Sequence, residues 1–184
     1  RIGDWGFYNS LYAGGSCFIK DARSLTHQLR AVGQNTGLIE ETYLANRRQL
    51  ELFLGRAEKE ISFDWANKTV AIVGLSFKRD TNDTRNAPSI EIVNFLLEKK
   101  VSKIKVYDPA AMDNFKLLFK NLMLIEYTKH EFEAIRDVDV LIIASDWPQF
   151  RGLADFLLTE LKSRPLIMDG RRMLQHRYQD LTLA

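Results

Sequence analysis

The sequence predicts an α/β fold in which a helical segment precedes a parallel sheet covered by helices. Two observations support this prediction. Between residues 21 and 60, apolar side chains recur at the spacings of three and four that are typical of amphipathic helices. From residue 69 onward, short apolar runs rich in β-branched residues alternate with helical patterns. We therefore divide the 184-residue chain into a helical region at 1–66 and an α/β domain at 67–184.

The helical region opens with a glycine-bearing, aperiodic segment at residues 1–20, which we expect to form a loop. A first helix is predicted to begin at Asp21 and to be interrupted near residues 33–37. A second helix is predicted at residues 36–60 and, at about 1.5 Å per residue, is long for a small domain. Because this chain alone can hardly bury its whole apolar stripe, we expect a second subunit or a neighbouring domain to cover it.

The α/β domain is predicted from alternating elements. Pro88, which the first turn of a helix tolerates, opens a helix that we expect to run to residue 99. Shorter helices are expected at 131–136 and 153–162. Strands are expected at residues 69–75, 103–108, 122–127, 138–145 and 165–169. This alternation favours a parallel sheet with both faces covered, joined by right-handed crossovers.

Residues that follow the strands are candidate ligand contacts, because open parallel sheets bind ligands beyond the carboxyl ends of their strands. The first strand lacks a GxGxxG fingerprint and has only Gly74, so it does not support a dinucleotide site. The sequence still allows a nucleotide site that is formed by Lys and Arg side chains. Two of the loops that follow strands are basic: Ser76-Phe77-Lys78-Arg79 and Asp169-Gly170-Arg171-Arg172.

The segment at residues 14–21 combines two glycines, the single cysteine and two charged side chains. Glycines let the backbone approach a ligand closely, and a helix that begins just after Cys17 would favour the nucleophilic thiolate. Lys20 adds a cation, and Asp21 shares a face with the cysteine if the helix begins early. The alternative is a buried cysteine in a tight turn, with Asp21 as a helix cap and Lys20 solvated. Spacing alone leaves both interpretations open.

The charged loop at residues 77–85 also has two interpretations. It is either a solvated loop, in which Asp80 and Asp83 neutralise the neighbouring cations, or a clamp for phosphate. The argument for the clamp is its place after a predicted strand, and the sequence leaves the two interpretations evenly balanced.

The composition excludes several classes of protein. Lys and Arg number 26 against 24 Asp and Glu, so the net charge of +2 argues against a general nucleic-acid or membrane surface. No apolar run approaches the roughly 18 residues of a membrane span. One cysteine excludes an internal disulfide and favours a reducing, cytoplasmic setting. We expect no metal ion. The chain starts at Arg1, with no sign of a leader, and we interpret it as a piece of a longer protein.

Five motifs follow one another in the order found in a single enzyme family. These are GGSCFIKD, GLSFKRDTNDTRNAPSIEI, VYDPAA, ASDWPQFR and DGRRML. Because of these five motifs, the chain resembles the UDP-glucose/GDP-mannose dehydrogenase family over essentially its whole length. The resemblance implies a central helical dimerisation region followed by a Rossmann-like, parallel-sheet UDP-binding domain. It also implies that an N-terminal NAD domain, together with the helix carrying the family's catalytic Lys and Asn, is missing from this chain.

The resemblance assigns roles by motif position. Cys17 corresponds to the thiol nucleophile that captures the sugar aldehyde, and Asp21 to the carboxylate that supports the hydrolytic water. Lys20 and Arg85 correspond to groups that reach toward NAD. Arg1 lies where the family has an arginine that reaches across the dimer to the sugar. The remaining substrate contacts are Gly14, Gly15, Phe77, Lys78 and Arg171.

The implied reaction oxidises the C6 alcohol of a nucleotide hexose twice, with two NAD, through a cysteine thiohemiacetal and thioester. The sequence departs from the family at Tyr12-Ala13, before the glycine pair, and at Ile19, where the family has proline. TRNAP and DWPQFR favour UDP-glucose as the substrate over GDP-mannose or a UDP-N-acetylhexosamine. The alternatives are a catalytically silent module that binds UDP-sugar and dimerises, and a purely structural assembly domain.

Overall fold

The computed structural model describes residues 10–182, and a five-stranded parallel sheet lies at the centre of this part of the chain. The strand order is β3-β2-β1-β4-β5, and every adjacent pair is parallel, which confirms the predicted sheet. The strands are β1 (Thr69–Val73), β2 (Lys103–Tyr107), β3 (Ile125–Tyr127), β4 (Val140–Ile143) and β5 (Leu166–Asp169). Because β2 lies on one side of β1 and β4 on the other, the strand order reverses at the carboxyl ends of β1 and β4. Such a switch point is the usual ligand position in open sheets.

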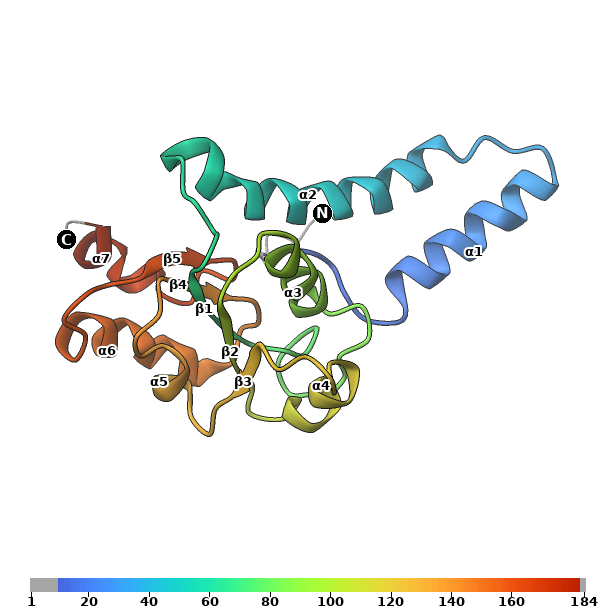
Figure 1. The fold of residues 1–184 in the computed structure, drawn as a ribbon. Coiled ribbons are helices and arrows are strands. Elements are labelled where there is room, and N and C mark those ends of the chain that lie inside the picture. Colours follow the sequence, from blue (N-terminus) through green and yellow to red (C-terminus); the bar gives the residue numbers. More distant parts are fainter. Residues whose placement is uncertain (1–9, 183–184) are drawn as a thin grey trace.

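Helices cover both faces of the sheet, as Figure 1 shows. The α-helices within the described residues are α1 (Phe18–Ala31), α2 (Gly37–Ile61), α3 (Pro88–Glu98), α4 (Met112–Leu118), α5 (Glu131–Ala134), α6 (Leu153–Thr159) and α7 (Tyr178–Thr182). Short 3-10 turns precede α6 and α7 at Pro148–Gly152 and Gln175–Arg177.

Two cores lie on opposite faces of the sheet, because side chains of a strand point alternately to its two sides. Val70 and Ile72 of β1 pack with apolar residues of α2, α3 and α4. Ala71 and Val73 pack with α5, α6 and the C-terminal elements. All four of these β1 side chains are fully buried. The C-terminal half of α2 thus shares a core with the sheet, and the domain boundary at residue 66 stays a prediction.

Several predicted boundaries differ from the structure. The first helix begins at Phe18, three residues before the predicted start at Asp21, so Cys17 becomes its N-cap residue. The strand predicted at 122–127 pairs only from Ile125, since it is an edge strand bound to β2 alone. We did not predict α4, which buries Phe115 alone and therefore shows no clear amphipathic pattern.

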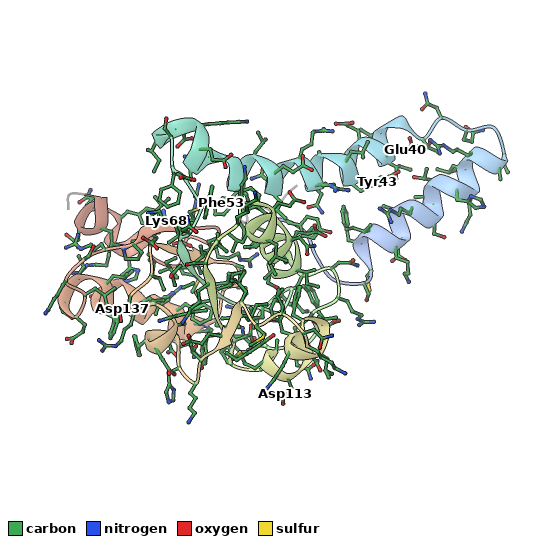
Figure 2. All side chains as sticks on the ribbon, in the orientation of Figure 1. Glu40, Tyr43, Phe53, Lys68, Asp113 and Asp137 are labelled. Carbon is green, nitrogen blue, oxygen red and sulfur yellow. The ribbon has the colours of Figure 1, made fainter. Side chains whose placement is uncertain are left out.

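The helices α1 and α2 form a hairpin that projects from the sheet (Figure 1). Figure 2 shows Glu40 and Tyr43 on the projecting part of α2, and Phe53 where the helix lies over the sheet. The two helices are joined by an ion pair of 2.6 Å between Arg30 and Glu40, and by Arg23 over the ring of Tyr43. The buried residues of α2 all lie in its C-terminal half, and Leu38 is 85% exposed. The described residues thus leave part of the predicted stripe of α2 exposed, and a second subunit that covers it stays a prediction.

Candidate functional site

The segment that leads to Cys17 crosses the carboxyl ends of the strands. Leu11 is buried against Gly170, just after β5, where a Cβ atom on the glycine would lie 2.2 Å from the leucine side chain. Gly14 and Gly15 then reach the loop that follows β1. Because this segment passes over the switch point of the sheet, it brings the predicted Cys17 site to the predicted ligand edge.

The glycine pair is required by close packing against the loop after β1. Gly15 has a φ of +86°, and a Cβ atom there would lie 2.9 Å from the ring of Phe77. A Cβ atom on Gly14 would lie 2.4 Å from the carbonyl oxygen of Asn86. Only glycine adopts this backbone without strain and leaves this space. The structure therefore brings together Gly14, Gly15 and Phe77, which the sequence predicted as parts of one site.

Cys17 is exposed at the N-terminus of α1. Its Sγ atom lies 3.8 Å from the hydroxyl of Ser16. Asp21 belongs to the first turn, where its backbone N–H donates to the carbonyl of Cys17 at 2.8 Å, and its carboxylate pairs with Lys20 at 3.2 Å. The cysteine is thus exposed among the described residues, and the alternative interpretation of it as a buried cysteine is wrong. Asp21 is not the helix cap of that alternative either.

Arg85 lies within electrostatic range of Cys17. Its pKa is raised chiefly by side-chain hydrogen bonds to Asp83, and the charge of Cys17 contributes in the same direction. The guanidinium lies 2.7 Å from the Asp83 carboxylate. The Arg85 hydrogen bonds also lower the pKa of Asp83. The interpretation that Asp83 neutralises a neighbouring cation is therefore confirmed for this pair.

The cations of the same loop differ in their partners. Arg79 lies 3.6 Å from Asp80 and 3.8 Å from Asp146. Lys78 is exposed, its Nζ lies 5.5 Å from the centre of the Phe77 ring, and no described carboxylate pairs with it. An exposed lysine beside an aromatic ring, at the end of a central strand, is well suited to a phosphate.

Arg171 lies at the end of β5 in a buried ion pair. Its guanidinium is 2.9 Å from Asp146, and the two side chains are 7% and 6% exposed. The pair joins the residues that follow β4 and β5. Sequence reasoning singled out Arg171 but gave no role to Asp146, whose signal is its place directly after an apolar strand.

Sequence reasoning also missed the part played by Asp108 at the end of β2. This carboxylate is 1% exposed and accepts hydrogen bonds from both Leu75 and Ser76 after β1, and from the Trp147 indole after β4. It also accepts the backbone N–H groups of Ala110 and Ala111. In dinucleotide-binding sheets an acidic residue after the second strand binds the ribose. Here the carboxylate is fully engaged with protein groups, so this sheet does not fit NAD.

A hollow of about 770 Å³ adjoins the Cys17 segment between α1, α2 and α3. Its lining includes Lys20, Arg23 and Asn86, with Glu91 from α3 and Tyr12 from the segment before Cys17. Burial, and then the charge of Glu91, raises the pKa of Tyr12, so the phenol stays protonated. The hollow mixes both signs of charge.

Comparison with known proteins identifies the family of this chain. Residues 71–176, more than half of the chain, match the model described as the UDP-glucose/GDP-mannose dehydrogenase family, UDP binding domain. The chain belongs to the UDP-glucose/GDP-mannose dehydrogenase family. Its predicted Rossmann-like α/β fold and the resemblance of its motifs are thereby confirmed.

Two curated relatives carry the name UDP-glucose 6-dehydrogenase. That of Pseudomonas aeruginosa is 32% identical over 177 residues, which cover 94% of this chain and 39% of the relative. That of Rickettsia conorii is 31% identical over 165 residues, which cover 89% of this chain and 37% of the relative. This family member therefore spans less than two-fifths of the length of either.

Two solved structures show the same fold. A UDP-glucose dehydrogenase from Pyrobaculum islandicum superposes with a TM-score of 0.77 at 27% identity, covering 96% of this chain and 38% of that one. A GDP-mannose dehydrogenase from Pseudomonas aeruginosa gives a TM-score of 0.71 at 21% identity, covering 91% and 38%. The second likeness is one of fold alone.

One predicted site residue of this family member cannot be placed, because Arg1 lies outside the described residues. Among the residues that the structure describes, no helix is both long and apolar enough to cross a membrane.

Proposed function

We propose that this chain is the substrate-binding half of an NAD-dependent nucleotide-sugar dehydrogenase that oxidises UDP-glucose to UDP-glucuronate. One observation carries the proposal. In a chain of this family, the exposed Cys17 sits on a glycine loop that packs against Phe77, at the carboxyl end of the central strand.

Cys17 is proposed as the nucleophile of the second half of the reaction. The Cys17 sulfur adds to the C6 aldehyde, and the carbonyl oxygen takes up a proton, which gives a thiohemiacetal. Loss of a hydride from C6 and of the hydroxyl proton leaves a thioester. Water then attacks the thioester carbonyl, the carbon–sulfur bond breaks, and the sulfur leaves as the free thiol. Asp21, one turn after Cys17, is proposed to orient that water.

NAD, when bound, accepts the hydrides of such a reaction. The sheet described here does not fit a dinucleotide, because its first strand lacks the glycine fingerprint and Asp108 is engaged by backbone N–H groups. Lys20 and Arg85 are exposed beside Cys17 and fit contacts to a cofactor held by another part of the protein.

The UDP group is proposed to bind where the strand order reverses. Lys78, which is exposed after β1, is proposed to bind a phosphate, and the ion pair between Arg171 and Asp146 borders the same edge of the sheet. Gly14 and Gly15, which pack closely against Asn86 and Phe77, are proposed to form the loop beside the sugar. The alternative substrates are GDP-mannose and a UDP-N-acetylhexosamine.

We further propose a homodimer through α2, in a cytoplasmic enzyme. Leu38, Leu44 and Leu52 are exposed on this helix at 85%, 45% and 57%. Large apolar side chains exposed along one helix are compatible with a protein interface. Sedimentation of a monomer alone at micromolar concentration would contradict the dimer.

The test of the catalytic proposal uses the chain joined to a complete NAD-binding region. Replacing Cys17 with Ser should abolish uronate formation, because an alkoxide at that position is a poorer leaving group than a thiolate. Ser16→Ala is the matched control, since it changes the neighbouring hydroxyl and keeps the thiol. Full turnover by Cys17→Ser would contradict the role of the thiol.

The second candidate is a catalytically silent UDP-sugar-binding and dimerising module. The misfit between this sheet and a dinucleotide favours it for the chain taken by itself. Nucleotide binding by the chain with no uronate formation in any complete version would support this module over the enzyme.

A further inference from the structure

Side-chain amides from two distant parts of the chain hold the backbone that leads to Cys17. Asn46 of α2 accepts the N–H of Ala13 at 2.7 Å and donates its own N–H to the Ala13 carbonyl at 3.1 Å. Asn86, in the loop after β1, donates to the carbonyl of Gly15 at 3.0 Å. The N–H of Gly15 donates to the carbonyl of Arg85, also at 3.0 Å. All four main-chain polar groups of Ala13 and Gly15 are therefore occupied.

The chemistry of asparagine suits both positions. A primary amide offers a donor and an acceptor side by side, which is what the N–H and carbonyl of one residue require. Asn86 also has a φ of +50°, a left-handed conformation that asparagine tolerates better than most residues. A hydrocarbon side chain of the same size could not make these hydrogen bonds at either position.

The position of Asn46 along α2 shows which parts of the molecule its contact with Ala13 connects. The next buried residue of α2 is Leu50, one turn further on, and the helix before Asn46 projects with α1 away from the sheet. Asn46 therefore lies where the projecting half of α2 meets the body of the molecule. A shift of α2 would be transmitted to Ala13, four residues before Cys17.

We propose that Asn46 and Asn86 are positioning residues that hold the Cys17 segment in place, and that Asn46 ties this segment to α2. The effect on catalysis rests on the proposed function. The hydrogen bonds of Asn46 and Asn86 to residues 13–15, which we call the asparagine clamp, can be measured without substrate. The two asparagines act on the backbone of residues 13–15 and do not themselves reach the sulfur.

The first experiment measures amide hydrogen exchange in the 184-residue chain. Asn46→Ala should speed exchange at Ala13 by about tenfold, the effect of losing one to two hydrogen bonds. Asn46→Asp keeps the acceptor for the Ala13 N–H and should retain most of the protection there. Asn86→Gly keeps the left-handed backbone, removes the amide, and should speed exchange at Gly15. Gln49→Ala, an exposed change one turn along α2, is the matched control and should change neither amide.

The second measurement separates positioning from general stability. Each variant should unfold within a few degrees of the unaltered chain, so that faster exchange is confined to residues 13–17. In the chain joined to its NAD-binding region, Asn46→Ala should lower kcat by about tenfold with KM for the UDP-sugar little changed.

Three results decide the proposal. Exchange at Ala13 and Gly15 that matches the Gln49→Ala control would overturn it, and so would faster exchange spread evenly over the sheet. If the clamp variants behave as expected but no variant of the complete enzyme forms uronate, the clamp stands and the proposed function fails.

Discussion

The central strands and the α1–α2 hairpin both carry apolar side chains, yet those of the central strands are fully buried and many of those in the hairpin are exposed. Val140 to Ile143 of β4 are completely buried, as are the β1 residues beside them. Within α1, all of which the structure describes, Thr26 alone is buried. Among the described residues, the central strands are therefore fully covered, whereas the hairpin leaves apolar side chains exposed that we propose a second subunit covers.

The Cys17 segment lies between these two regions. It is fixed to the sheet by contacts of Gly15 with the loop after β1, and to the hairpin by Asn46. The position of Cys17 in the proposed reaction should therefore depend on whatever packs against the hairpin. The proposed ligand contacts Lys78 and Arg171 follow strands of the sheet, and the proposed nucleophile is linked to the exposed hairpin.

The largest difference between the sheet and the hairpin is expected when one apolar residue is truncated in each. Ile72→Ala in β1 should lower the free energy of unfolding by about 4 kcal/mol, because the side chain is fully buried and leaves a cavity. Leu38→Ala on α2 should change it by less than about 0.5 kcal/mol in the isolated chain. Urea unfolding measures both. Equal losses would show that the hairpin is packed as firmly as the sheet.

Ion pairs provide the next comparison. Asp146→Asn should cost about 3 kcal/mol, because it leaves the nearly buried Arg171 guanidinium without its carboxylate. Arg30→Gln, in the hairpin, should cost less than about 1 kcal/mol, because Arg30 is 63% exposed. The same unfolding experiment measures both. A larger loss for Arg30→Gln would contradict the account of where the stability lies.

Glycine substitutions give a smaller and more local effect. Gly15→Ala should cost about 2 kcal/mol, since the new methyl group meets a positive φ and the Phe77 ring together. Gly33→Ala, in the hairpin turn, meets a φ of +73° with open space around it, and should cost about 1 kcal/mol. The difference between the two isolates the contact with Phe77, and equal costs would show that this contact is not tight.

The sequence predicted the parallel sheet well, because buried strands such as β4 are short, apolar and β-branched. It predicted Gly14 and Gly15 as a site of close approach but could not show that the near neighbours are Phe77 and Asn86. Contacts between residues 71 positions apart, such as Gly15 with Asn86, depend on the path of the chain over the sheet. The bonds of Asp108 were missed for the same reason, since its partners come from loops after two other strands.

The most direct test of the central claim is calorimetric titration of this chain with UDP and with GDP. We expect UDP to bind and GDP to bind more weakly, and we expect Lys78→Ala to weaken UDP binding by about tenfold, the effect of one charge-assisted phosphate contact. Lys162→Ala, an exposed change at the other end of the sheet, should leave UDP binding unaltered. Failure of both nucleotides to bind, or equal UDP binding by the two lysine variants, would contradict the account.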